Sequence, residues 1–264
     1  MNSTATLPRL SQIRVTRSEW IKASSLRSTW YNLAAVLLGL IAISIGLSWT
    51  TRAFWDDLDA QAQANFDAVG VSLGGVVLAQ MVIAVLGVQI ISGEYSTGMI
   101  RSSFGAVPQR TMVLFGKLTV IASLTFVFSL IGSFAAFFIG QAVLGDHGIS
   151  IESSGALRSV LGAAFNLTAI AILATSVGFM ARSTAGGIGI ILGILLVLPV
   201  LGAILPLGWL NDIMEYLPAN AGNAVMATDV TPAAISPLAG LITMIAWIVA
   251  FIAAAAIMLT RRDV

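Results

Sequence analysis

Charged residues are scarce in this sequence, and cysteine is missing altogether. Only 9% of the 264 residues are charged and 58% are apolar, whereas soluble domains carry about 25% charged residues. Such a chain could not cover a water-facing surface, so the composition excludes a soluble enzyme and also a disordered segment. The lack of cysteine excludes disulfides and thiolate metal sites, and a single histidine, His147, argues against a histidine metal site.

The sequence contains long runs of apolar residues. About 20 apolar residues in a helix span about 30 Å of hydrocarbon, and backbone groups in lipid must bond within their own segment, which favours helices. Six runs are long enough, and they predict spans over residues 30–50, 69–92, 113–144, 156–180, 185–207 and 234–260. We therefore predict an all-α integral membrane protein with a six-span transmembrane domain over residues 30–260.

The basic residues predict which side of the membrane each loop occupies. With a cytoplasmic N-terminus, Arg52 and Arg158 are the only two of the 13 Lys and Arg residues that fall in outer loops. Cytoplasmic loops carry an excess of Lys and Arg. The pattern therefore predicts that both termini are cytoplasmic.

An arm over residues 1–29 precedes the first span. Its apolar residues Leu10, Ile13, Trp20 and Ile21 fall along one helical face, and basic residues occupy the rest. This pattern predicts an amphipathic interfacial helix in the headgroup region. Two interpretations stay open: a basic flank that only sets topology, or a helix that also contacts a cytoplasmic partner. The residues of interest are Glu19, Trp20, Lys22 and Arg27.

The connection between the second and third spans, residues 93–112, is the longest internal cytoplasmic loop. We predict a short helix over residues 94–106, ended by Gly105 and Pro108 because proline cannot continue a helix. Arg101, Arg110 and Lys117 supply positive charge. The alternative is a solvated loop with ordinary cytoplasmic charges.

The outer segment over residues 206–233 is amphipathic and bounded by prolines. Trp209 and Tyr216 suit an interfacial position, and we expect the segment to be re-entrant, dipping into the outer leaflet where protein covers it. His147, in another outer loop, is expected to be solvated.

Three amide side chains fall inside predicted spans: Gln80, Gln89 and Asn166. A buried amide in lipid needs a partner, so each should face another helix or a watery cavity. They either line a transport pathway or form interhelical hydrogen bonds, and we favour the second interpretation. The glycines at 186, 187, 189 and 193 predict close helix packing rather than a nucleotide site.

The two cytoplasmic segments together resemble the permease subunits of ABC type-2 transporters. In that family an E-x3-G-[TM] element follows the second span, and a P-x-R element and a lysine come next. The arm SEWIKASSLRSTW and the ending LTRRDV are similar to the family's sequences as well. The loop residues that match are Glu94, Gly98, Met99, Pro108, Arg110 and Lys117.

The resemblance implies half of an ATP-driven exporter in a bacterial plasma membrane. It would move a hydrophobic or amphipathic compound such as a drug, peptide or lipid. The complete transporter would contain a second permease, identical or related, and two ABC ATPase subunits. The permeases would be embedded in the lipid bilayer. No cofactor is expected on this chain, because ATP and Mg would be bound by the ATPase and the sequence has no G-x4-G-K-[ST] loop. No nucleic-acid partner is expected.

With such a partner, the predicted helix in the loop becomes a coupling helix. Its exposed side would enter a groove on the ATPase, with charged contacts at Glu94 and Arg101 and an apolar anchor of Met99, Ile100 and Phe104. The residues predicted to couple to the ATPase are Glu94, Gly98, Met99, Arg101, Phe104, Pro108 and Arg110.

The sequence is compatible with two other functions. One is a membrane component of a signalling or assembly complex without transport. The other is a polytopic membrane enzyme, which would need a metal-binding set, a carboxylate pair or a serine with a histidine. A single histidine in an outer loop does not supply these sets, so we predict a transport subunit and no enzyme activity.

Overall fold

The structure is a computed structural model that describes residues 11–205, 212–228 and 234–261. These residues form helices joined by short connections, and no strand occurs among them. The helical segments long and apolar enough to cross a membrane are Arg27–Ala53, Ala68–Ser96, Arg110–His147, Ala156–Ala181, Thr184–Gly202 and Pro237–Arg261. The predicted all-α membrane fold with six spans is therefore confirmed.

Four spans contain one long helix each: α2 (Arg27–Ala53), α7 (Arg110–Leu144), α8 (Ala156–Ala181) and α13 (Pro237–Arg261). The second span is divided into α4 (Ala68–Leu73) and α5 (Val76–Ser96). Its glycine pair lies against α2, where a Cβ on Gly75 would come within 3.1 Å of the Leu40 backbone. The fifth span consists of α9 (Thr184–Leu192), a π-helical turn, η3 (Gly193–Val197), and α10 (Leu198–Ile204).

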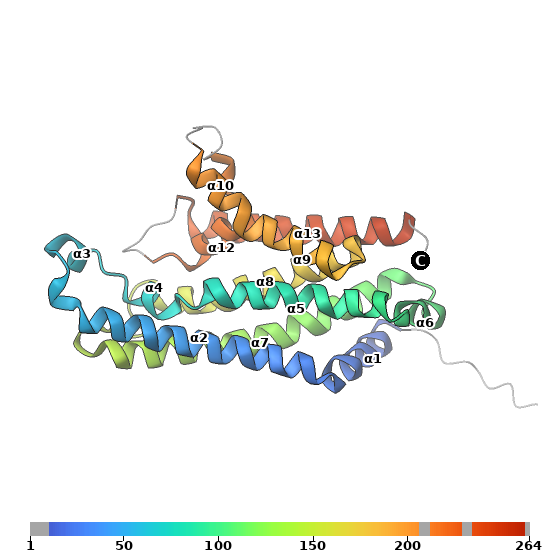
Figure 1. The fold of residues 1–264 in the computed structure, drawn as a ribbon, viewed down its shortest axis with the longest axis horizontal. Coiled ribbons are helices and arrows are strands. Elements are labelled where there is room, and N and C mark those ends of the chain that lie inside the picture. The colour runs from blue at the N-terminus through green and yellow to red at the C-terminus, as the bar shows by residue number, and fades with distance from the viewer. Residues whose placement is uncertain (1–10, 206–211, 229–233, 262–264) are drawn as a thin grey trace, which may run out of the picture.

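Helix α8 forms the centre of the bundle. In the most apolar 18-residue stretch of α8, 78% is buried inside the bundle, against 22% for the equivalent stretch of the fifth span and 11% for that of α13. Helices α5, α7 and α13 pack around α8, and α2 packs on the outer side of α7 (Figure 1). The fifth span and α13 therefore present most of their apolar surface outward, towards lipid or another chain.

The two ends of the bundle differ in what they carry. Helices α1 (Gln12–Ser25) and α6 (Met99–Ala106) and the final turns of α13 lie at one end, and α3 (Ala60–Ala64) lies at the other (Figure 1). At the α3 end, the turns η1 (Trp55–Asp57) and η2 (Gly145–His147) meet, and the Trp55 ring stacks on His147 at 3.8 Å. His147 is therefore partly covered rather than fully solvated.

The outer segment at 206–233 is described only in part, and Trp209 and the stretches 206–211 and 229–233 lie outside the described residues. Within it, α12 (Pro218–Met226) packs between α8 and α13. A Cβ on Gly162 would meet the Val225 carbonyl at 2.8 Å, and one on Gly240 would meet the Ala221 carbonyl at 2.7 Å. The helix is thus covered by protein.

The glycines predicted to permit close packing at the fifth span behave differently from one another. A Cβ on Gly187 would come within 2.6 Å of Val88 on α5, so this glycine does allow close approach. A Cβ on Gly189 or Gly193 would meet no described atom within 4 Å, so these two glycines make no close contact within the described part of the chain. Gly193 instead begins the π-helical turn.

The sidedness of the bundle stays a prediction, and reporter fusions would test it. Because Lys and Arg gather at the end that carries α1 and α6, fusions after residues 60, 150 and 220 should report an outer location. A fusion after residue 264 should report the cytoplasm. A cytoplasmic signal from the fusion after residue 220 would contradict the assignment.

Candidate functional site

Helix α1 lies along the start of α7 through a narrow face of residues four positions apart. Val15, Glu19 and Ala23 are its buried residues. The contact is close because Gly116 of α7 has no side chain, and a Cβ there would lie 3.2 Å from Val15. Gln12 also donates a hydrogen bond to the Met112 carbonyl at 3.1 Å.

The opposite side of α1 carries the apolar residues that the sequence predicted to enter the headgroup region. Ile13 is 81% exposed and Ile21 is 59% exposed, and Trp20 is also exposed. Leu10 lies outside the described residues. Glu19 departs from the prediction of an interfacial residue, because it belongs to the buried face.

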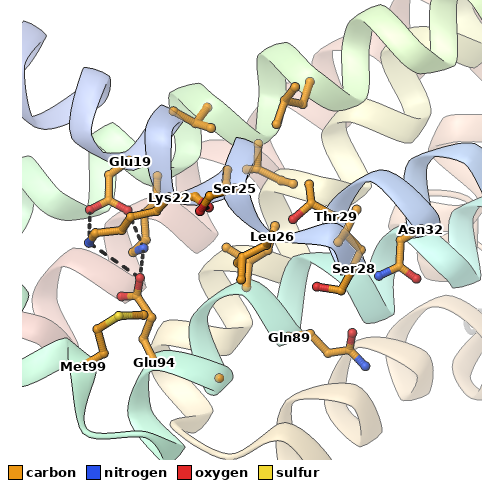
Figure 2. A pocket seen from close by; sticks show the side chains of 18 of the residues that line it. Glu19, Lys22, Ser25, Leu26, Ser28, Thr29, Asn32, Gln89, Glu94 and Met99 are labelled. Carbon is orange, nitrogen blue, oxygen red and sulfur yellow. Dashed lines mark hydrogen bonds and ion pairs between the residues drawn. The ribbon is translucent and has the colours of Figure 1, made fainter.

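Four charged side chains meet where α1, α5 and α7 converge (Figure 2). Lys117 Nζ donates to Glu19 Oε2 at 2.5 Å and to Glu94 Oε1 at 2.7 Å. Lys22 Nζ donates to Glu19 Oε1 at 2.7 Å and lies 3.7 Å from Glu94 Oε1. We refer to Glu19, Lys22, Glu94 and Lys117 as the ion cluster.

Most of the ion cluster is buried, and its formal charges balance. The side chains of Glu19 and Lys117 are each 4% exposed and that of Glu94 is 6% exposed, whereas Lys22 is 32% exposed. Burying an ion costs several kcal/mol unless an opposite charge and hydrogen bonds compensate it. Each charge in the cluster therefore needs the others to offset the cost of its burial. These contacts hold α1, α5 and α7 together in one arrangement.

The turn between α5 and α6 sets where Glu94 points. Helix α5 continues to Ser96, and Gly98 has φ +73°, a left-handed conformation that favours glycine. The new helix begins at Met99. The prediction of one helix over residues 94–106 is therefore wrong, because Glu94 lies in the last turn of α5 and faces α1 and α7 rather than a partner.

Helix α6 presents a different face from the one predicted. Ile100 is 1% exposed and Phe104 is half-buried, with the Arg110 guanidinium 5.6 Å from its ring centroid. These two side chains hold α6 on the bundle, so they do not form the predicted exposed anchor. Met99 and Arg101 are exposed at the surface. Lys22 Nζ also donates to Ser103 Oγ at 3.0 Å, which connects α6 to the ion cluster.

Pro108 and Arg110 lie at the junction of α6 and α7. Pro108 is exposed just before α7 begins. Arg110 donates to the Leu259 carbonyl at 3.0 Å and so fixes the start of α7 to the end of α13. Both residues shape the end of the bundle rather than its exposed surface at α6.

The three amides predicted inside spans are not brought together. Gln80 is buried in α5, and Asn166 is 1% exposed in α8, where it lies against the Gly222 backbone of α12. Neither amide atom of Asn166 has a hydrogen-bond partner among the described residues, so the interhelical bond that the sequence favoured is not formed there. Gln89 is exposed and lines a cavity beside the ion cluster.

Sequence reasoning did not anticipate the partners of Glu94. The sequence gives Lys117 as a basic residue that matches the family's lysine at the start of the third span, and it does not single out Ser103. A signal was available, because a lysine about two helical turns inside an apolar helix needs a buried acid. Which acid it meets is decided by the packing of α1 on α7.

Six spans with short helices and a buried ion cluster at one end define a multi-pass helical membrane protein. The model of a family described as ABC-2 family transporter protein matches residues 16–206, which include most of α1, all of α6 and most of the membrane bundle. The chain belongs to this family. It is a membrane permease of an ABC transporter. None of the curated proteins compared matches the chain.

Proposed function

We propose that the chain is the permease subunit of an ATP-driven exporter in a bacterial plasma membrane, coupled to its ATPase through α6. The observation that supports this is the ion cluster and its bond to α6. Lys22 contacts Ser103 of α6, while Glu94 and Lys117 belong to membrane-spanning helices. A displacement of α6 would therefore be transmitted to both α5 and α7.

The exposed side of α6 would provide the contact with the ATPase. Met99 and Arg101 are the exposed apolar and basic residues there, and a few central apolar or Arg residues often dominate such interfaces. Glu94 acts behind the interface in this proposal, as a positioning residue that holds α5 against α1 and α7. ATP and Mg would be bound by the ATPase subunits.

The complete transporter would contain a second permease and two ATPases. The fifth span and α13 leave most of their apolar surface uncovered, which fits contact with lipid and with a second permease. The proposed cargo is a hydrophobic or amphipathic compound such as a drug, peptide or lipid. Export is inferred from the family resemblance.

Substitution of Arg101 on α6 tests the coupling. Arg101→Glu should reduce co-purification with the ATPase and reduce stimulation of ATP hydrolysis by at least about tenfold, because loss of a dominant interface residue costs about 2 kcal/mol or more. Met99→Ala should give a smaller loss in the same assays. Both variants should insert and fold like the parent.

Arg261→Glu is the matched control, because it reverses an exposed basic residue at the same end of the bundle but outside α6. It should retain parental co-purification and ATPase stimulation. If Arg101→Glu also retained them while folded, α6 would not be the coupling element.

A further inference from the structure

A cavity of about 440 Å³ lies beside the ion cluster, between α1, α2, α5 and α7, and Met99 of α6 also lines it (Figure 2). Its size is within the range of about 300–1,000 Å³ that small-molecule sites occupy. The ion cluster closes one end of it. The other walls are mostly apolar and are formed by Leu86, Ile90, Val120, Ile121 and Leu124.

The apolar wall extends well into the predicted hydrocarbon region. Leu124 is 14 residues after the start of α7, which corresponds to about 20 Å along a helix. Leu86 is ten residues before the end of α5, or about 15 Å. The cavity is therefore polar at the end near the membrane surface and apolar at greater depth.

Two amides line the cavity without a protein partner. Asn32 of α2 and Gln89 of α5 both border it, and neither forms a hydrogen bond with any described residue. Figure 2 shows both amides on the side of the cavity away from the ion cluster. Amide side chains inside a membrane protein need hydrogen-bond donors and acceptors. A ligand with its own hydrogen-bonding groups would therefore form the hydrogen bonds that Asn32 and Gln89 lack.

The mouth of the cavity lies between the α1–α2 junction and α5. The exposed lining residues are Ser25, Leu26 and Ser28 on one side, and Gln89, Gly93, Thr97 and Met99 on the other. A Cβ on Gly93 would meet no described atom within 4 Å, so this glycine leaves the mouth open. A molecule embedded in the membrane can approach from that side without separating the helices.

The balanced charge of the ion cluster indicates which charge the head group of a ligand can carry. Two carboxylates face two ammonium groups, so the cavity has no excess charge from this end. Asn32 and Gln89 both donate and accept hydrogen bonds. These properties suit an uncharged head that carries hydroxyl or amide groups, and they offer no counter-charge to an anionic or a cationic one.

We propose that this cavity binds a membrane amphiphile with an uncharged, hydroxyl- or amide-bearing head and an apolar chain. The head lies between Asn32 and Gln89, on the side of the cavity away from the ion cluster, and the chain lies along Val120, Ile121 and Leu124. The inference deepens the proposed export function, on which it rests for its physiological role. Binding itself does not require the ATPase.

Photo-crosslinking of the purified chain, without the ATPase, tests the proposal. The probe is a monoacylglycerol with a diazirine in its acyl chain, presented in phosphatidylcholine nanodiscs. We expect saturable labelling of cavity residues on α5 and α7. Unlabelled monoacylglycerol should compete at least about tenfold better than a fatty acid or an alkylamine of the same chain length, which would each bring an uncompensated charge.

Three variants locate the site. Gly93→Leu fills the mouth and should abolish the saturable labelling, whereas Gly46→Leu should leave it unchanged, because a Cβ on Gly46 also meets nothing within 4 Å and Gly46 does not line the cavity. The double substitution of Asn32→Leu and Gln89→Leu should weaken binding about tenfold, through the loss of two hydrogen bonds.

Labelling spread over all lipid-facing helices, or labelling that persists in folded Gly93→Leu, would overturn the proposal. Equal competition by the fatty acid would overturn the assignment of an uncharged head. Failure of the exporter function would appear separately, as intact binding by a chain that neither assembles with nor stimulates an ATPase.

Discussion

Replacement of Lys117 with methionine should lower the free energy of unfolding by about 3–5 kcal/mol, the usual cost of removing one partner from a buried ion pair. Lys117 Nζ donates to both Glu19 and Glu94, and all three side chains are almost completely buried. Without the ammonium group, two carboxylates would share only Lys22. Thermal unfolding of the purified protein in detergent would measure the loss.

Two controls separate charge from packing. Lys22→Met should cost less, because the Lys22 side chain is 32% exposed and water compensates part of its charge. The triple variant Lys117→Met, Glu19→Gln and Glu94→Gln should recover stability relative to Lys117→Met alone, since it leaves fewer buried charges without a partner. If Lys117→Met unfolded at the parental temperature, the ion cluster would not hold the helices together.

The same variants distinguish a positioning role from a purely structural one. The triple variant should fold, yet ATPase stimulation should stay below the parental level, because the charged contacts between α1, α5 and α7 are gone. Full recovery of both stability and stimulation would mean that the cluster contributes only to stability.

The membrane architecture was predictable because it depends on local composition. Each span is set by a run of apolar residues that needs no knowledge of its neighbours, and the six predicted ranges coincide closely with the observed helical segments. The helix at α1 was predictable for a similar reason, since amphipathicity is a local pattern. Breaks within spans were less evident, and η3 was not foreseen.

The site was not predictable because it depends on distant contacts. The motif places Glu94 just after the second predicted span, but the direction of its side chain depends on where α1 packs, and Glu19 and Lys117 are 98 residues apart in the chain. Asn32 and Gln89 line the same cavity only because α2 and α5 pack beside each other, which the sequence pattern does not show. The motifs therefore select Glu94 and Lys117 as candidate residues, but they do not predict that these two side chains contact each other.

Replacement of Gly87 with leucine should destabilise the bundle by about 1–3 kcal/mol or more through overpacking. A Cβ on Gly87 would lie 2.8 Å from Ala174 Cβ and 3.0 Å from the Ala171 carbonyl. Small residues allow membrane helices this close approach. Because the nearest atoms include the backbone of α8, a larger side chain at position 87 would fit only if α5 moved away from α8.

The movement of α5 gives this substitution a second consequence. Glu94 lies on the same helix, two turns beyond Gly87, so a shifted α5 would weaken the ion cluster and ATPase stimulation together. Gly93→Leu is the matched control, because it adds the same side chain to α5 where a Cβ meets no described atom within 4 Å. Its unfolding temperature should be parental. Equal unfolding temperatures for Gly87→Leu and the parent would show that the contact between α5 and α8 tolerates a larger side chain.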